Sequence, residues 1–210
     1  LELINNNQFD TIYHEHYFYF SLTTLQNIFI KHKLSIYNIE KLKTHGGSLR
    51  IYATHLGNSL DAGSDKTSVK EIIKEETNHG VSQLSFYSEL ANNAYKIKLN
   101  ALKYLVDQKI LNKSIIAFGA AAKGNTFLNY CGIQKDIIDF VIDETPSKIG
   151  KYLPQSKIPI LSFEMLKKKK PDIIIILPWN HQEEILAKLE FTKLWNAEIV
   201  TFIPELKIHQ

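Results

Sequence analysis

The sequence predicts an α/β protein whose C-terminal half forms a parallel sheet covered by helices. From residue 113 onward, short apolar runs alternate with segments of helical periodicity, a repetition that is typical of parallel sheets with helices on both faces. The N-terminal part differs, because an amphipathic helix is followed there by two alternating segments that can pair as antiparallel strands. The chain therefore combines two kinds of sheet.

The first predicted helix begins after Ser21, a good N-cap, and its apolar residues fall three or four positions apart until near Lys33. Residues 34–39 and 48–53 then alternate with period two on either side of a glycine pair, which predicts an antiparallel pair of strands. Residues 57–65 are rich in Asn, Ser and Gly and are the best candidate for a linker or turn. A short helix ending near Gly80 and a longer one with apolar spacing from Leu84 to Leu105 follow.

The C-terminal half alternates between the two kinds of element. Strands are expected at residues 114–118, 139–142, 172–177 and 198–203, and helices at residues 125–131, 163–170 and 182–189. The expected domain organisation is residues 1–56, a connecting region of residues 57–112, and a C-terminal domain of residues 113–210.

Composition excludes several classes of protein. The chain has 210 residues and a formal net charge of +3, which is too near neutral to indicate nucleic acid as a partner. The run of lysines at residues 167–170 is expected to be the solvated end of a helix. No apolar run approaches the roughly 20 residues of a membrane span. A single cysteine, Cys131, allows no intrachain disulfide and no cysteine-based zinc site, and fits a reducing cytoplasm.

The densest group of proton-handling side chains is Tyr13, His14, Glu15 and His16, within a run of aromatic residues. Imidazole can act as a base near neutral pH, a carboxylate can orient it, and a phenol can hydrogen-bond an oxyanion, so these types suffice for proton abstraction beside a carbonyl. A packed aromatic loop is the alternative. A metal site is a weaker one, because His-x-His supplies two ligands and no third is obvious nearby.

A second candidate site lies between the two N-terminal strands. Its residues are His45, Gly46, Gly47, Ser48 and Arg50. Paired glycines let a backbone approach a ligand closely, and the serine and arginine could hydrogen-bond a hydroxyl or a phosphate. The alternative is a hairpin turn without a ligand.

A third candidate is the turn between the strand ending at Phe118 and the following helix. Its candidate ligand-binding residues are Gly119, Lys123, Gly124, Asn125 and Thr126. Two of the three glycine positions of a dinucleotide-binding turn are present, and Asp143 follows at the expected acidic distance. A lysine near a helix N-terminus suits a phosphate. A turn that only packs is the alternative.

A fourth candidate follows the most apolar strand. Trp179 and Asn180 come directly after it, and ligands of open parallel sheets lie at the carboxyl ends of the strands. The indole could stack on a base or cap the core.

Five stretches together resemble one family. They read FDTIYHEH at residues 9–16, HGGSLR at 45–50, GAAAKGNT at 119–126, NYCG at 129–132 and LPWN at 177–180. In this order they are similar to signature motifs of S-adenosylmethionine-dependent C-methyltransferases that act on nucleoside-diphosphate keto-sugars, and the resemblance covers nearly the whole chain.

The resemblance implies a fold. Residues 1–56 would be the terminal helix and antiparallel strands of a class I methyltransferase domain, and residues 113–210 a Rossmann-like domain that helps to hold the nucleotide-sugar. The family also has an N-terminal zinc-binding segment and a glycine-rich loop for S-adenosylmethionine. We expect both to lie in a part absent from this sequence, which begins at Leu1, so that the chain alone is expected to be inactive.

The resemblance also implies a mechanism. His16 matches the base, Glu15 orients it or hydrogen-bonds, and Tyr13 lies near the sugar. His16 would remove the proton beside the 4-keto group of a sugar linked to dTDP, and the enolate carbon would attack the methyl sulfonium. A different function remains open: a non-catalytic nucleotide- or NAD-binding module with a regulatory role, which would use the same glycine turn and Asp143. A structural scaffold is a third, weaker possibility.

Overall fold

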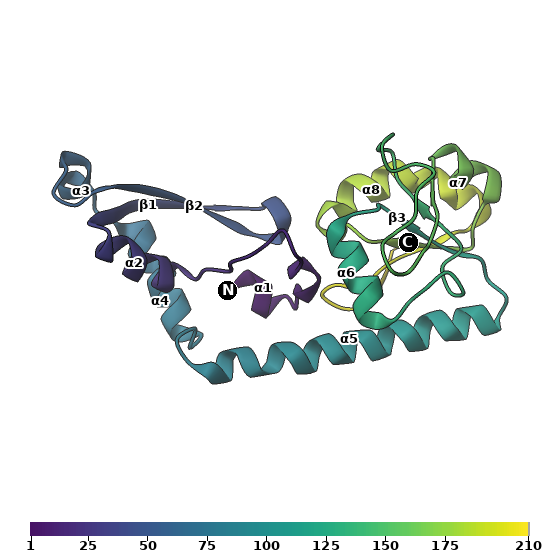
Figure 1. The fold of residues 1–210 in the computed structure, drawn as a ribbon, viewed down its shortest axis with the longest axis horizontal. Coiled ribbons are helices and arrows are strands. Elements are labelled where there is room, and N and C mark those ends of the chain that lie inside the picture. Colours follow the sequence, from purple (N-terminus) through teal and green to yellow (C-terminus); the bar gives the residue numbers. More distant parts are fainter. Residues whose placement is uncertain (210) are drawn as a thin grey trace. The chain divides into compact units, whose positions relative to one another are not determined.

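The computed structural model of the chain describes residues 1–209. It is a mixed α/β structure with a two-stranded antiparallel sheet and a six-stranded, mostly parallel sheet, which confirms the combination expected from the sequence (Figure 1). Contacts divide the chain into two compact units. Unit 1 consists of Leu1–Asn5 and His16–Asn92, and unit 2 of Asn6–Glu15 and the chain from Asn93 onward. The domain ranges expected from the sequence stay a prediction.

Unit 1 is built on a hairpin and the helices that cover it. Helix α1 spans Glu2–Asn5, and α2 spans Leu22–Lys31 with Ser21 as its N-cap, since the Ser21 hydroxyl accepts a hydrogen bond from the Thr24 amide, as expected. Strand β1 (Leu34–Leu42) pairs antiparallel with β2 (Ser48–His55), and a β-bulge interrupts the register between Ile36 and Asn38. The predicted strand pair is therefore confirmed and is longer than the sequence pattern indicated.

Helix α4 (Thr67–Asn78) closes the core of unit 1. The buried cluster joins α2, β1 and α4, and its members are Leu22, Ile36, Ile39, Val69 and Ile72. A buried carboxylate, Glu76 of α4, accepts hydrogen bonds from the amides of Leu22 and Thr23 at 2.7 and 2.8 Å. These are amides of the first turn of α2, which have no partner within the helix, so Glu76 joins the two helices by a charge-assisted contact.

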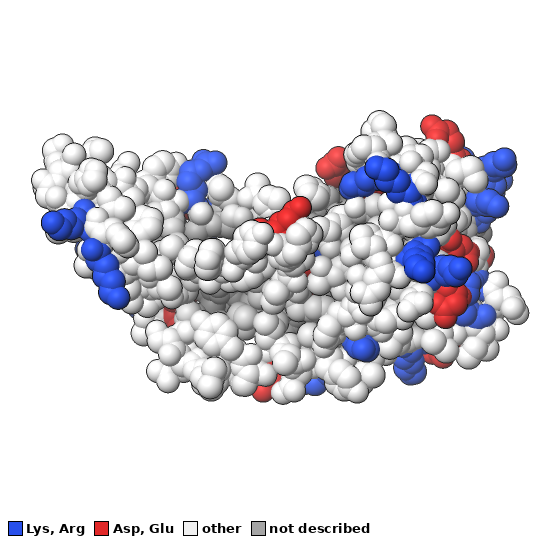
Figure 2. Space-filling view, in the orientation of Figure 1, with Lys and Arg blue, Asp and Glu red and all other residues white. Residues whose placement is uncertain are grey.

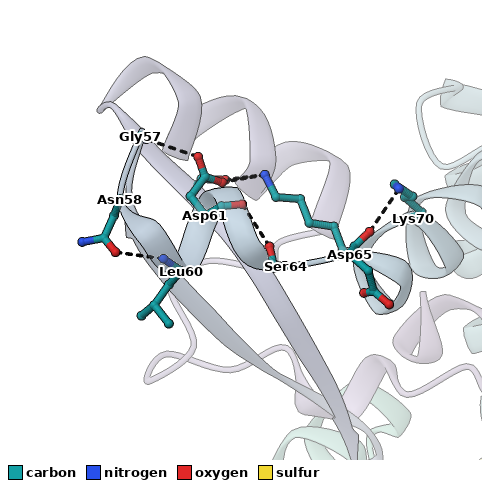
Figure 3. Close-up of polar contacts among 9 residues, drawn as sticks. Gly57, Asn58, Leu60, Asp61, Ser64, Asp65 and Lys70 are labelled. Atoms are coloured by element: carbon teal, nitrogen blue, oxygen red, sulfur yellow. Dashed lines mark hydrogen bonds and ion pairs between the residues drawn. The ribbon is translucent and has the colours of Figure 1, made fainter.

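Residues 57–65, expected to be a linker or turn, contain a short helix, α3 (Ser59–Gly63). Asn58 caps it through the Leu60 amide, and Asp61 accepts hydrogen bonds from the Gly57 amide and from Nζ of Lys66, the latter at 2.6 Å (Figure 3). The hydrogen bond from Lys66 lowers the pKa of Asp61 to about 2. Local polar contacts thus order a segment that composition alone would describe as irregular.

Helix α5 (Leu84–Ile110) is the long helix expected from the sequence, and it starts in unit 1 and continues into unit 2. Five of the six strands of unit 2 then run parallel in the order β5-β4-β3-β6-β7, and β8 is antiparallel at the edge. The strands are β3 (Ile115–Phe118), β4 (Val141–Ile142), β5 (Ile160–Leu161), β6 (Ile173–Ile176), β7 (Glu198–Thr201) and β8 (Lys207–His209). The sequence predicted β3, β4, β6 and β7. It missed β5 and β8, which are too short for a periodic signal.

Helices follow the strands of unit 2 in the expected places. They are α6 (Ala122–Cys131), α7 (Glu164–Lys169) and α8 (Gln182–Leu189), and the 3₁₀ turns are η1 (Phe9–Thr11), η3 (Trp179–His181) and η4 (Glu190–Trp195). A further 3₁₀ turn, η2 (Thr44–Gly46), lies between β1 and β2 of unit 1. Helix α6 starts three residues earlier than expected. Residues 167–170 are exposed at the end of α7, as predicted for a solvated helix end.

The two faces of the six-stranded sheet bury different helices. Ile116 and Ile174 belong to the cluster that contains Leu166 of α7 and Ile185 of α8. Ile175 points the other way, because neighbouring residues of a strand alternate between faces, and it lines a small pocket with Phe127 of α6. Helix α6 thus starts at the carboxyl end of β3 and covers one face, while α7 and α8 cover the other.

Two further features of the structure concern the charge of its surface and the apolar character of its helices. Over unit 2, Lys side chains lie interspersed with Asp and Glu on the face shown in Figure 2. None of the helices formed by residues 1–209 combines the length and the apolar character that a membrane span requires.

Candidate functional site

The loops that follow β3 and β6 pack closely against each other. These strands are neighbours at the centre of the parallel sheet. Gly119, with φ of +88°, has no room for a side chain, because a Cβ there would lie 2.6 Å from Cδ of Pro178. A Cβ on Gly124 would lie 2.6 Å from Cβ of Leu177. Both glycines therefore let the loop after β6 approach the turn and the first part of α6.

Asp143, at the end of β4, braces the turn after β3. Its Oδ2 accepts a hydrogen bond from the Ala120 amide and its Oδ1 one from the Thr145 amide, both at 2.8 Å. Nζ of Lys148 lies 3.4 Å from Oδ2 and also donates to the Ala120 carbonyl. Burial alone would favour the neutral acid, but these hydrogen bonds and the lysine prevail and lower the pKa of Asp143. Both oxygens of this carboxylate are already engaged within the protein.

Lys123 is the buried cation of this edge of the sheet. It lies in the first turn of α6, is 8% exposed, and donates a hydrogen bond of 2.7 Å to Oδ1 of Asn180. Its Nζ lies 4.5 Å from the ring centroid of Trp179, within the range of a cation–π contact. Burial lowers the pKa of Lys123, while the charge of Asp10 opposes that shift. The ammonium has only a neutral amide and an aromatic face as partners in these contacts.

Asp10 contacts the edge of the Trp179 indole. Its Oδ2 accepts a hydrogen bond of 2.8 Å from Nε1 of Trp179, and its Oδ1 is buried without a hydrogen-bond partner. The residue is 1% exposed and belongs to η1. Burial raises the pKa of Asp10 to about 6, although Trp179, Lys123 and the backbone amides of Asp10 and Thr11 all favour the charged form. A buried carboxyl group with only one of its two oxygens hydrogen-bonded is unusual, and such groups are often functional.

The residues of the expected catalytic motif differ in exposure and in unit. Tyr13 is half-buried and belongs to unit 2, and burial raises its pKa, helped by Glu15 and Asp10. Glu15, also in unit 2, is exposed, with Oε1 3.9 Å from Nε2 of His14. His16 is exposed in unit 1, where its ring packs edge-on at 6.2 Å from that of Tyr19.

The second candidate group forms the tip of the β1–β2 hairpin in unit 1. Its backbone is unusual, because His45, Gly46 and Gly47 all have positive φ. A Cβ on Gly47 would lie 2.8 Å from Cγ of Glu2, so this glycine accommodates α1. These residues therefore form the turn of a hairpin, and whether the turn binds a ligand stays a prediction.

The polar members of that group have partners within the hairpin. The Ser48 hydroxyl donates to the Thr44 carbonyl at 3.0 Å. Arg50 lies opposite Glu40 in the register and donates to its Oε2 at 3.1 Å. Both side chains therefore contribute to the hairpin, and their part in ligand binding stays a prediction.

Two further candidates lie in the second turn of α6. The Thr126 hydroxyl donates to the Ala122 carbonyl at 3.1 Å, which is a local bond within the helix. The amide oxygen of Asn125 is buried without a hydrogen-bond partner. Among residues 1–209, no cluster of three or more His, Cys, Asp or Glu side chains could hold a metal ion.

Comparison with known proteins identifies the family. A family model described as the C-methyltransferase C-terminal domain matches residues 43–204. The chain belongs to this family. C-methyltransferase NovU of Streptomyces niveus is 34% identical over 209 residues, which are 99% of this chain and 49% of that protein. The chain thus spans about half the length of this curated relative, and the family expected from the sequence motifs is confirmed.

Within the range that the C-methyltransferase C-terminal domain matches, the structure joins two candidates that are 57 residues apart, Lys123 and Asn180. Outside that range it adds one residue that the sequence did not single out. Asp10 appears in the sequence only as part of a motif. The signal that could have found it is a carboxylate close to the apolar side chains of Phe9 and Ile12, where a charge is costly if the segment is buried.

Proposed function

We propose that this chain is the C-terminal part of an enzyme that C-methylates a nucleoside-diphosphate 4-keto-deoxysugar, with dTDP as the nucleotide. Membership of the C-methyltransferase family supports the reaction type. The observation that carries the substrate is the contact of Lys123 with Asn180 at the carboxyl ends of β3 and β6. From β3 the sheet extends to one side through β4 and β5, and to the other side through β6 and β7, so the strand order reverses between β3 and β6. Open α/β sheets bind ligands at such a switch point, and this order supports a Rossmann-like domain.

The diphosphate is the part of the substrate that this edge suits best. The first amides of α6 have no acceptor within the helix, Ala121 provides no side-chain cap, and Lys123 adds a positive charge. A buried ammonium held by a neutral amide gains more from an anion than a solvent-exposed one, since screening there is weak. We therefore assign Lys123 and Asn180 to the phosphates, with the turn at Gly119 and the start of α6 beside them.

Trp179 serves this site by positioning Lys123. Nζ of Lys123 lies 4.5 Å from the centroid of its ring, and its Nε1 donates a hydrogen bond to Asp10. A ring that is engaged in this way is less suited to stack on a base than an open one, so we assign Trp179 to the lysine.

His16, Glu15 and Tyr13 perform the proton chemistry in this proposal. His16 removes the proton from the carbon beside the keto group, and Glu15 orients it. The Tyr13 hydroxyl donates a hydrogen bond to the enolate oxygen, and its raised pKa keeps that proton on the phenol at neutral pH. S-adenosylmethionine is the co-substrate that supplies the methyl group.

We assign no residue of this chain to S-adenosylmethionine. The group that could bind a ribose at the glycine turn is the Asp143 carboxylate, and both of its oxygens are hydrogen-bonded within the protein. The same observation weighs against the alternative of an NAD-binding module, which would need that carboxylate for the ribose hydroxyls. The donor and any zinc are expected in the part of the protein outside this chain.

Two experiments test the proposal. In the full-length protein, His16→Ala should lower kcat by about 10²–10⁴-fold with the Kd for the nucleotide-sugar changed less than about threefold. The neighbouring His14→Ala, which removes another exposed imidazole, should leave both within about threefold. Unchanged turnover in His16→Ala would contradict the assignment.

The second experiment is calorimetry of this chain with dTDP, a dTDP-sugar, NAD and S-adenosylmethionine. The proposal expects dTDP and the dTDP-sugar to bind and NAD not to compete. Tight NAD binding without dTDP binding would instead support the nucleotide-binding module.

A further inference from the structure

Asp10 is a buried carboxyl that packing does not explain. It is 1% exposed, one of its oxygens has no hydrogen-bond partner, and it lines a small pocket among Phe127, Ile175 and Phe202. Burying a carboxyl group in such surroundings is costly, and the hydrogen bond from Trp179 offsets part of that cost. A buried carboxyl with one oxygen left without a hydrogen-bond partner is a candidate for a functional role.

The turn that carries Asp10 is held from two sides. Phe9 packs against Phe127 and Tyr130 of α6, with ring centroids 6.4 and 4.9 Å apart. On the other side, Asp10 is bonded to Trp179 in η3. Helix α6 also carries Lys123 and η3 also carries Asn180, so the two elements that fix this turn are the two that present the proposed phosphate ligands.

The contacts form a short chain from that site to the expected catalytic motif. Lys123 contacts both Asn180 and the face of Trp179, and the edge of Trp179 contacts Asp10. Asp10 is three residues before Tyr13, and residues 6–15 all belong to unit 2. An anion that attracts the Lys123 ammonium changes the charge over the indole, and the indole N–H is the donor that holds Asp10.

We propose that Asp10 is a positioning residue, which couples occupancy of Lys123 and Asn180 by a nucleoside diphosphate to the ordering of residues 13–15. It acts through Trp179 and the backbone and touches no reacting atom. This inference rests on the proposed function for the identity of the ligand, and it adds a connection between the site for the diphosphate and the residues that handle the proton.

The test is hydrogen–deuterium exchange of the full-length protein with and without dTDP, followed on peptides covering residues 9–16. In the unsubstituted protein, dTDP should slow exchange there at least threefold. Asp10→Ala should abolish this protection while the Kd for dTDP changes less than threefold. Asp10→Asn should keep the protection, because the amide oxygen accepts the indole N–H. Asp136→Asn, an exposed carboxylate of the same unit, is the matched control and should keep it too.

Kinetics of the same variants separate positioning from a merely structural role. Asp10→Ala should lower kcat about tenfold with KM within threefold, and Asp10→Asn should restore kcat to within about threefold. Trp179→Phe removes the donor and leaves Asp10 in place, and it should lose the protection as Asp10→Ala does. This second variant keeps the inference testable if Asp10→Ala does not fold.

The outcomes distinguish the two proposals. If dTDP binds and Asp10→Ala retains full protection, or if Asp10→Asn fails as badly as Asp10→Ala, the coupling is overturned and the proposed function stands. If the unsubstituted protein binds no dTDP, the proposed function is overturned for its substrate, and the coupling with it.

Discussion

The indole Nε1 of Trp179 lies 2.8 Å from Oδ2 of Asp10, a hydrogen bond between residues 169 positions apart. It joins the turn before the Tyr13 motif to the loop after β6. Nζ of Lys123 lies over the face of the same indole, 4.5 Å from the ring centroid. One aromatic side chain thus connects a buried cation, Lys123, and a buried acid, Asp10, of unit 2.

The stability of the protein should depend on pH through Asp10. Burial raises the pKa of Asp10 to about 6, so the folded protein retains a proton that the unfolded chain releases between about pH 4 and 6. The free energy of unfolding should therefore fall, by about 2–3 kcal/mol, as the pH rises through this window. Asp10→Asn has no such proton, and its stability relative to the unsubstituted protein should increase over the same window.

Urea denaturation at pH 4.5 and 7.5 measures this difference. Asp136→Asn, an exposed carboxylate, should show no comparable change between the two pH values. Equal behaviour of the Asp10→Asn and unsubstituted proteins at both would show that the acid is already ionised at pH 4.5.

Lys123→Met should weaken the binding of dTDP. The substitution keeps the length and the apolar stem of the side chain and removes the charge, so it should raise the Kd about 10- to 100-fold, the range of a lost charge-assisted hydrogen bond. Lys135→Met, at an exposed lysine of the same unit, should have little effect. Calorimetry at one ionic strength makes the comparison, and equal Kd values for the two variants would exclude Lys123 from the phosphate site.

Gly124→Ala should destabilise the fold even though alanine favours helices. The added Cβ would lie 2.6 Å from Cβ of Leu177 and must displace the loop after β6. Overpacking of this kind costs about 1–3 kcal/mol, more than the roughly 1 kcal/mol that alanine gains in a helix. Gly63→Ala has open space around the new methyl group and should be neutral or slightly stabilising. Thermal unfolding of both variants decides; equal melting temperatures would contradict the close approach.

Glu76→Ala should weaken the core of unit 1. It leaves the buried amides at the start of α2 without their carboxylate acceptor, a loss of about 2–4 kcal/mol. Glu71→Ala, on the exposed side of the same helix, should change stability by less than about 0.5 kcal/mol. Urea unfolding followed by circular dichroism separates the two, and a small effect at Glu76 would mean that water replaces the carboxylate.

Local patterns were sufficient for most elements. The Ser21 cap, the alternation in β1 and β2 and the apolar runs of β3 and β6 depend on neighbours in the chain, and the structure confirms all of them. Composition did not predict the helix within residues 57–65, a segment rich in turn formers where hydrogen bonds of Asn58 and Asp61 stabilise α3. Strands β5 and β8 were missed because a strand of two or three residues is too short to show an alternation of apolar and polar residues.

The sequence by itself determined the family, the alternation of strands and helices, and the candidate residues at the ends of the strands. The tertiary structure alone decided which of them meet. It joined Lys123 to Asn180, engaged Asp143 within its own turn, and buried Asp10 against Trp179. The physical reason is that helix and strand signals arise from residues a few positions apart, whereas burial and the pairing of charges depend on segments that only folding brings together.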